Sequence, residues 1–245
     1  MAQTMKDVKA ISIPVNGTNV IVKKIEDSNG NIIWGSLDAF PYRRLDYIES
    51  NGTQYIDTNQ SSTSSGAPVG IKLDFAMTSV PSTQQAFGSL NNVSGQYYRH
   101  HSQITSSFNY WVNQTNYQNI ASTDTDRHIL EVNYDLDGKI KYDNVEKATG
   151  ASTISNDSLN YFLFARNNSG TAGNFCTMKV YSCYMKLSNA TVYLIPCQRK
   201  SDNAIGMLKI FVPTSGSTIY GFRANAGTGT FSYGSIVDEY WDLTV

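Results

Sequence analysis

The chain has 245 residues and a mass of 27.1 kDa, which suits one large domain with a buried core, or a domain with a short appendage. Its 19 Lys and Arg residues nearly balance its 20 Asp and Glu residues, which argues against binding a nucleic-acid backbone, because that needs clustered positive charge. Only 16% of the residues are charged, whereas Asn, Ser and Thr number 22, 27 and 21, so much of the polar surface is uncharged and fits a neutral ligand such as a sugar, or an exposed β scaffold.

The first forty residues are predicted to form a separate unit. Asn-Gly turns separate three short apolar segments, at residues 10–15, 19–25 and 31–34. Such a β-meander is too small to bury a core by itself. We therefore expect Ile32, Ile33 and Trp34 to pack on another surface. That surface is either the main domain, of which the meander would be an extra layer, or a partner protein to which it would anchor the chain.

The rest of the chain is predicted to be all-β. Alternating or continuous apolar patterns predict strands at residues 69–75, 127–134, 139–142, 161–165, 178–186 and 190–196. The Asp-Gly pair at residues 137–138 predicts a hairpin between the second and third of these. No long stretch has the period of a helix, although a short helical turn is allowed near Gln84 or at residues 203–207. Many short strands separated by turns indicate a two-sheet sandwich or a barrel.

The three cysteines, Cys176, Cys183 and Cys197, are predicted to be buried thiols of a protein made in a reducing compartment. Cys176 and Cys183 are seven residues apart, so a regular strand would place them on opposite faces. No stretch approaches the 18 apolar residues of a membrane span, and the N-terminus lacks the apolar segment of a secretion signal. We therefore expect synthesis in a cytoplasm and no membrane partner.

Few residues could carry catalysis. His100 and His101 are adjacent, so on a strand they point to opposite faces and cannot hold one ion together. Asp135 and Asp137 are two residues apart, about 7 Å along one strand face, which is compatible with an inverting glycoside hydrolase. Their place before a glycine favours a turn role instead. We expect no enzymatic activity.

Calcium is the ion considered for the acidic loops, and its support is weak. Asp124 and Asp126 supply hard oxygen ligands, but no spacing resembles an EF-hand loop. Solvated loop acids are the favoured interpretation, so we expect neither a cofactor nor a metal site.

The strongest candidates for ligand binding are aromatic. Sugar rings stack their C–H faces on flat aromatic side chains, while amides and ring nitrogens bond their hydroxyl groups. The candidate glycan contacts are Tyr97, Tyr98, His100, Tyr110, Trp111 and Tyr117. The alternative is that these rings are half-buried strand residues that pack the sandwich, since alternation in residues 110–112 turns at least one of them inward.

Four separated segments resemble one known group of domains. Residues 45–58 resemble the opening strand motif of LamG-like, concanavalin A-like jelly-roll domains found in tail and other structural proteins of phages and prophages. Later motifs of the same group, in the same order, are similar to residues 164–168, 195–202 and 225–231. Residues 22–35 are also similar to leader segments that precede such domains. The chain departs from the group at residues 208–210, and residues 235–245 extend past its usual end.

The resemblance implies a two-sheet antiparallel jelly-roll sandwich at residues 41–234, with a small N-terminal β appendage at residues 1–40 and an extension at 235–245. In the motifs, Gly52, Gly227 and Gly229 are expected to serve turns. The implied function is a non-enzymatic surface protein of a phage particle, anchored by the appendage and binding host-surface glycan. A decoration protein of the capsid or tail without a ligand is the first alternative, and a secreted bacterial lectin or glycan hydrolase the second.

The resemblance also implies the partners and the location of the protein. The partners would be other virion proteins of the capsid, tail or baseplate, together with a glycan of the host cell surface, and the protein would be multicopy or homo-oligomeric. It would be made in the host bacterial cytoplasm and displayed on the virion surface, where many copies raise the avidity of weak single sites.

Overall fold

The computed structural model describes residues 11–15, 18–22, 25–26, 32–34, 41–61, 70–79, 83–93, 96–151 and 158–237. Within these ranges, the side chains of residues up to 34 and of residues 92–100 are not described. The described chain consists of strands and turns and contains no helix, as expected from the sequence. No helix in this part of the chain is therefore long and apolar enough to cross a membrane.

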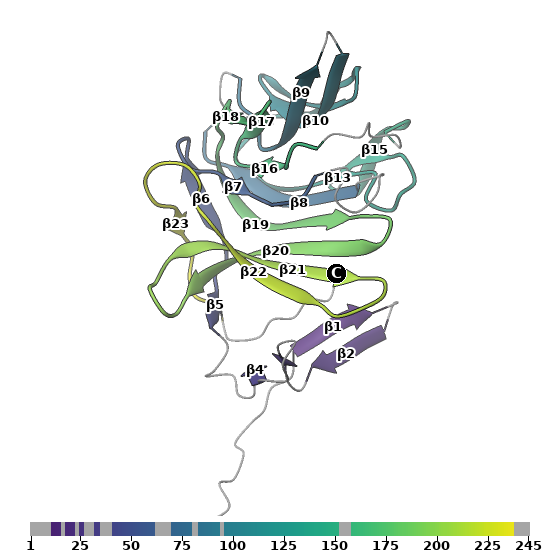
Figure 1. Cartoon of the computed structure of the whole chain (residues 1–245). Helices are drawn as coiled ribbons and strands as arrows, with labels where there is room; N and C mark the ends of the chain where they lie inside the picture. The colour runs from purple at the N-terminus through teal and green to yellow at the C-terminus, as the bar shows by residue number, and fades with distance from the viewer. Residues whose placement is uncertain are drawn as a thin grey trace, which may run out of the picture.

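Two large antiparallel sheets stack to form a sandwich (Figure 1). The first sheet follows the spatial order β12-β11-β10-β9-β16-β7. β17 joins it through a parallel pairing with β9, and β18 joins it by pairing with β17. Its strands are β7 (Ile56–Asp57), β9 (Phe87–Val93), β10 (Gln96–Ile104), β11 (Ser107–Val112), β12 (Thr115–Ser122), β16 (Phe162–Leu163), β17 (Arg166–Asn168) and β18 (Thr171–Gly173).

The second sheet is larger and curves across the middle of Figure 1. It follows the order β15-β14-β13-β8-β19-β20-β21-β22, with β5, β6 and β23 paired to it off this path. Its strands are β5 (Tyr42–Arg44), β6 (Ile48–Asn51), β8 (Gly70–Met77), β13 (Arg127–Val132), β14 (Ile140–Tyr142), β15 (Val145–Ala148), β19 (Thr177–Lys186), β20 (Ala190–Arg199), β21 (Ile205–Pro213), β22 (Ile219–Ala224) and β23 (Ser232–Tyr233).

The leading residues form two separate pairs of strands. β1 (Ile11–Val15) pairs with β2 (Thr18–Val22), and β3 (Ile25–Glu26) pairs with β4 (Ile32–Trp34). Among the described residues neither pair hydrogen-bonds to a strand of the two large sheets. The predicted strands at residues 10–15, 19–25 and 31–34 are thus present, but as two two-stranded pieces rather than one meander.

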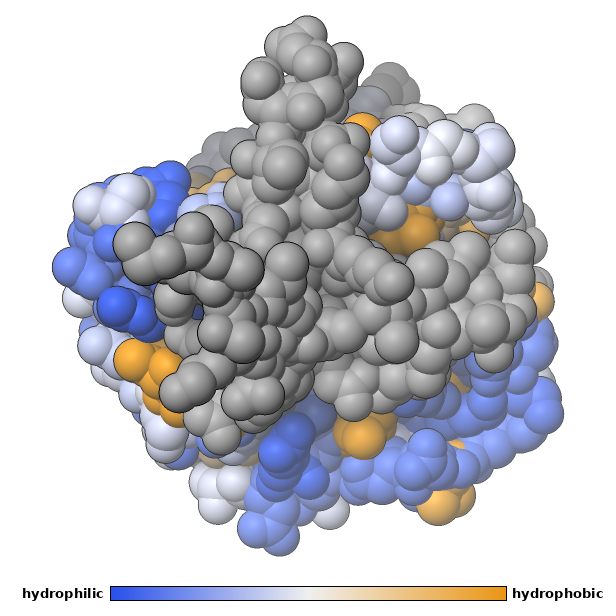
Figure 2. Space-filling model, turned by 90° about the horizontal axis from the view of Figure 1, so that it is seen from below, coloured by the Kyte–Doolittle hydropathy of each residue, from blue (hydrophilic) through white to orange (hydrophobic). Residues whose placement is uncertain are grey.

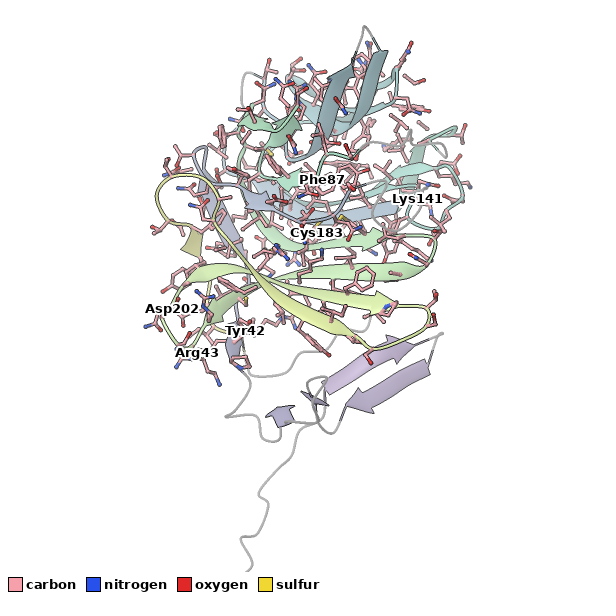
Figure 3. All side chains as sticks on the ribbon, viewed as in Figure 1. Tyr42, Arg43, Phe87, Lys141, Cys183 and Asp202 are labelled. Atoms are coloured by element: carbon pink, nitrogen blue, oxygen red, sulfur yellow. The ribbon has the colours of Figure 1, made fainter. Side chains whose placement is uncertain are left out.

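The core lies between the two large sheets. Alternation along β8 buries Ile71, Leu73 and Phe75, which have no exposed surface. The Phe75 ring meets Phe108 of the first sheet, with the ring centroids 5.7 Å apart. Figure 3 shows Phe87 and Cys183 inside the sandwich and the charged Lys141 and Asp202 at its periphery. Burial of this continuous apolar layer is the main stabilising term of the fold.

The predicted hairpin at residues 135–138 is confirmed. β13 pairs antiparallel with β14, and the Asp137 carboxylate accepts a hydrogen bond from the Lys139 N–H at 3.1 Å. Residues 161–165 are all buried, as expected of a central strand, but only Phe162–Leu163 pair, between β9 and β7. Residues 203–207 lead into β21 instead of forming a helical turn, and Gln84 forms an isolated bridge with Ile104.

The cysteine prediction is partly confirmed and partly wrong. Cys176, Cys183 and Cys197 are unpaired and fully buried, which raises the pKa of each thiol well above its usual value. Cys176 and Cys183, however, both face the core. A β-bulge lies between Val180 and Ser182 of β19, and its extra residue shifts the alternation by one position.

The chain returns at its end to close the sandwich beside its opening motif. Gly52 and Gly229 have positive φ angles of 94° and 72°, as their expected turn roles require. Gly227 has another role, because a Cβ there would lie 2.2 Å from the Thr53 carbonyl oxygen. Residues 235–237 hydrogen-bond to residues 44–46, so the sandwich continues three residues past the expected boundary at 234.

Candidate functional site

A row of side chains crosses the outer face of the first sheet. Strand register aligns Phe162 with Gly88, Gly88 with His101, and His101 with Trp111. Across the next hairpin turn, Trp111 aligns with Asn116. Of the residues that alternate with these along the strands, Leu163, Phe87 and Tyr110 lie in the core and Tyr117 packs against it. We call this set of five residues the Trp111 row.

The indole of Trp111 is held in place by its neighbours. Trp111 is half-buried, and its Nε1–H donates a hydrogen bond to the Gln103 side-chain oxygen at 2.8 Å. The His101 ring, which is only 3% exposed, lies beside it with the ring centroids 6.4 Å apart. Gly88 contributes no side chain to the row. An oriented aromatic ring beside amide groups is a combination that suits stacking and hydrogen bonding with a sugar ring.

The strands around Trp111 are almost free of charge. Residues 75–123, which include β9 to β12, contain one Lys, Arg, Asp or Glu residue, Arg99. The outer face of the second sheet differs, because Lys141, Glu131 and Lys72 are successive cross-strand partners there, and the Lys72 ammonium lies 3.0 Å from the Glu131 carboxylate. The two outer faces are therefore chemically distinct, and the face of the first sheet suits a neutral ligand.

Tyrosines also occur on the outer face of the second sheet, but cations cover them. The Arg127 guanidinium lies 3.8 Å from the centroid of the Tyr181 ring, and the Lys179 ammonium lies 4.6 Å from that of Tyr47. These cation–π contacts occupy ring faces that would otherwise stack on a ligand. The Trp111 row is thus the better candidate for sugar stacking.

The predicted glycan contact at Tyr110 is wrong. Tyr110 has no exposed surface and belongs to the core, where burial raises the pKa of its hydroxyl well above 10. Register pairs Tyr110 with Tyr117, so Tyr117 lies on the same, inward side of the sheet, packs partly buried against the core, and has a raised pKa because of burial. Of the rings at positions 110, 111 and 117, only that of Trp111 lies on the outer face, because side chains alternate along a strand.

Several predicted residues lie outside what the structure describes. Tyr97, Tyr98 and His100 are in β10, whose backbone is described, but their side chains are not. The predicted anchor residues Ile32, Ile33 and Trp34 form β4, again without described side chains. Both predictions remain predictions.

The acidic residues at 135 and 137 are engaged in structural contacts. The Asp135 carboxylate accepts a hydrogen bond from the Lys141 ammonium at 2.8 Å, which lowers the pKa of Asp135. Asp137 bonds the turn backbone. The turn role favoured by the sequence is confirmed for Asp137.

The imidazole of His128 connects two acidic residues from different turns, Asp124 and Asp143. His128 Nε2 lies 2.7 Å from Asp124 and Nδ1 lies 2.8 Å from Asp143. Although burial alone would lower the pKa of His128, these two hydrogen bonds outweigh it and raise the pKa, while the bond to His128 lowers the pKa of Asp124. The Asp124 carboxylate also accepts a hydrogen bond from the Asp126 N–H at 2.8 Å, which stabilises the turn at residues 124–126. Within the described ranges, no three or more His, Cys, Asp or Glu side chains gather to hold a metal ion.

Sequence reasoning missed the partners of Trp111. His101, Gln103 and Asn116 were not among the predicted site residues. The sequence contained a signal for Asn116 alone, because a two-residue turn at residues 113–114 fixes the pairing of Trp111 with Asn116. The pairing with His101 depends on the longer hairpin that joins β10 to β11, whose register the sequence does not specify.

Comparisons with known proteins place the chain in no family. No family model matches the chain, and no curated protein matches it either. A solved structure titled "NanB plus Optactamide" aligns with 77% of this chain at 10% sequence identity and a TM-score of 0.40. The aligned part covers 39% of that other chain, so this protein spans well under half of its length. A similarity of this size carries no argument about function.

Proposed function

We propose that the protein is a non-enzymatic surface protein of a phage particle and that its sandwich binds neutral carbohydrate of the host surface through the Trp111 row. Carbohydrate binding is supported by one observation: the indole of Trp111 is half-buried and oriented on a sheet face that is almost free of charge. The phage setting rests on the resemblance of residues 45–58 and of the three later motifs to jelly-roll proteins of phages. Many copies on one particle would convert weak single sites into firm attachment.

Glycan-array binding followed by titration of a bound glycan tests this proposal. We expect Trp111→Ala to weaken binding about tenfold or more, because the loss of one aromatic contact of about 1.4 kcal/mol changes Kd by that factor. Tyr181→Ala is the matched control, since Tyr181 is a half-buried ring on the charged outer face of the second sheet. It should leave binding unchanged.

Two results would contradict the proposal. One is the absence of array binding by the unaltered protein, and the other is an equal loss in Trp111→Ala and Tyr181→Ala. Release of reducing sugar from host cell walls, abolished by Asp137→Asn, would instead support the glycan hydrolase.

A decoration protein without a ligand is the second candidate. It is favoured by an apolar cluster on the outer face of β20, β21 and β22, a place where a free-standing sandwich usually carries polar residues. The cluster contains Tyr193, Ile195, Cys197, Leu208 and Ile210, each at most 5% exposed. Because these side chains are buried, the layer adds to the stability of the sandwich, which suits a purely structural domain.

A further inference from the structure

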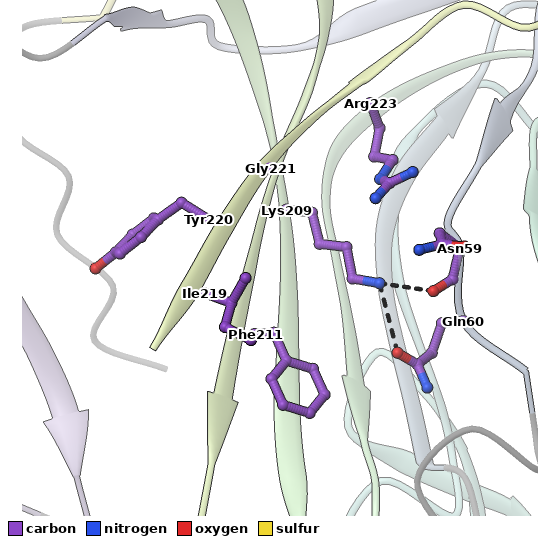
Figure 4. Close-up of a pocket in the computed structure, with 8 residues that line it drawn as sticks. All are labelled: Asn59, Gln60, Lys209, Phe211, Ile219, Tyr220, Gly221 and Arg223. Carbon is purple, nitrogen blue, oxygen red and sulfur yellow. Dashed lines mark hydrogen bonds between the residues drawn. The ribbon is translucent and has the colours of Figure 1, made fainter. Parts of the chain in front are cut away.

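A cavity of about 280 Å³ opens where the two sheets part at one edge of the sandwich (Figure 4). Asn59 and Gln60, which follow β7, line one side of the cavity. Lys209 and Phe211 of β21 and Ile219 and Arg223 of β22 line the other. β7 is at the opposite end of the first sheet's strand order from β11 and β12, so this cavity is separate from Trp111 itself, although Phe162 at the other end of the row pairs with Asp57 of β7.

Lys209 carries a buried charge with only neutral partners. The residue is 8% exposed, and its ammonium donates hydrogen bonds to the Thr58 carbonyl at 3.0 Å, the Asn59 carbonyl at 2.8 Å and the Gln60 side-chain oxygen at 3.5 Å. Burial, together with the nearby positive charge of Arg223, lowers the pKa of Lys209 to about 8. The side chain is therefore still mostly protonated at neutral pH.

Arg223 brings a second positive charge to the same cavity. Register pairs Met207 with Arg223 and Lys209 with Gly221, so Lys209 and Arg223 lie on one face of two adjacent strands. Gly221 places no side chain between them, and Figure 4 shows both cationic side chains on one side of β22 while Tyr220 points away from Lys209. The Nε atom of Arg223 is buried and has no hydrogen-bond partner in the described part of the chain.

No carboxylate of the described residues neutralises this pair of cations. None of the ion pairs within 4 Å in the described ranges involves Lys209 or Arg223. The Asp57 charge acts from a distance and raises the pKa of Lys209, but less than burial lowers it. Its two carboxylate oxygens instead accept the Asn59 N–H at 2.8 Å and the Asn160 amide at 3.3 Å. Two neighbouring, partly buried cations that form no ion pair within 4 Å are unfavourable. An anion between them would offset their repulsion and accept a hydrogen bond from the unpaired Arg223 Nε–H.

We propose that this cavity binds a small organic carboxylate, with the carboxylate group between Lys209 and Arg223 and the body of the ligand against Phe211 and Ile219. Guanidinium groups pair well with carboxylates because both are planar. Ile219, 62% exposed at the mouth, and the half-buried Phe211 supply an apolar wall. The volume lies near the lower end for small-molecule sites, which limits the ligand to about one ring. A sugar acid and the C-terminal carboxylate of a short peptide share this chemistry.

Isothermal titration calorimetry on the full chain tests the proposal and separates the two sources. The probes are sodium glucuronate against glucose, and N-benzoylglycine against its amide. We expect at least one carboxylate to bind and its neutral counterpart not to bind. The pair that responds identifies the source. Sodium sulfate is the third probe, and binding of sulfate as tight as that of either carboxylate would overturn the organic part of the proposal.

Two variants connect binding to the cavity. Arg223→Gln should weaken carboxylate binding at least tenfold, whereas Arg199→Gln, which removes an exposed arginine paired with Asp202, should not. Gly221→Val should block the site without unfolding the protein, because a Cβ at Gly221 meets nothing closer than an Arg223 nitrogen at 3.9 Å. Trp111→Ala should leave carboxylate binding unchanged, so failure here is distinguishable from failure of the neutral-glycan site.

The proposal is overturned if neither carboxylate binds the unaltered protein. It is also overturned if both Arg223→Gln and Gly221→Val bind a carboxylate as well as the unaltered protein does. An unchanged thermal midpoint of Gly221→Val is the check that any loss of binding reflects the filled cavity.

Discussion

Asparagine in this protein serves the backbone as much as the surface. Of the eleven described non-glycine residues with positive φ, seven are Asn. Asn tolerates this left-handed region better than other residues because its short amide bonds the local backbone. Asp143 and Asn144, for example, make the tight turn between β14 and β15 with φ angles of 51° and 63°. The high Asn content is thus explained partly by turn geometry.

His128 makes the stability of the protein depend on pH, because both of its ring nitrogens contact carboxylates. Its folded pKa is raised by Asp124 and Asp143, so the contacts stabilise the protein fully below the unfolded pKa of about 6.5 and lose this effect as the pH rises through the folded pKa. Both carboxylates are almost half exposed, so solvent screens the interaction.

We expect His128→Gln to lower the free energy of unfolding by about 1 kcal/mol at pH 5.5 and by much less at pH 9. Urea denaturation at the two pH values measures the difference. An equal loss at both pH values would show that the imidazole contributes through packing rather than through its charge.

At the scale of elements, the structure depends on places where the chain departs from regular strands. The bulge in β19 turns Cys183 and Met185 inward after Met178 and Val180, so one long strand keeps an apolar face on both sides of the irregularity. The segment after β22 packs against the opening motif, where the Thr228 N–H donates a hydrogen bond to the Thr53 carbonyl at 3.1 Å. The opening and closing motifs therefore stabilise each other.

Gly227→Ala tests how tightly these two motifs are packed. The added Cβ would meet the Thr53 carbonyl at 2.2 Å, so the segments must separate, and we expect a loss of roughly 2–3 kcal/mol of stability. Gly173→Ala is the matched control, because nothing lies within 4 Å of its Cβ position, and it should change stability by less than about 0.5 kcal/mol. Chemical denaturation compares the two variants. A Gly227→Ala protein as stable as the control would mean that the closing segment moves aside at little cost.

For the whole molecule, the arrangement separates surfaces of different chemistry. The first sheet presents a face almost free of charge, the β13–β14 side of the second sheet presents alternating charges, and β20 to β22 carry the outer apolar cluster. Seen from below, the coloured surface is mostly hydrophilic with separate hydrophobic residues (Figure 2). Such a separation leaves the uncharged face open to a ligand, whereas the residues of the outer apolar cluster are already buried.

Deletion of residues 1–40 distinguishes the two interpretations of the leading segment. If the segment is an anchor, the truncated protein should fold with an unchanged thermal midpoint but be missing from phage particles. If it is an extra layer of the same domain, deletion should expose apolar surface, raise the binding of a hydrophobic dye and lower the midpoint. The anchor proposal fails if the truncated protein still enters particles.

The sequence by itself determined the all-β class, because period-2 apolar patterns and Asp-Gly and Asn-Gly turns act between near neighbours. It also determined the hairpin at residues 135–138 and the burial of the three cysteines. It could not decide which ring of residues 110 and 111 faces outward, since that depends on which sheet face packs on the second sheet. Nor could it join Lys209 to Arg223 and to Asn59, residues 14 and 150 positions away. Only the pairing of β21 with β22 and the closure of the two sheets bring these groups together, because long-range contacts follow from the packing of the whole core rather than from any local pattern.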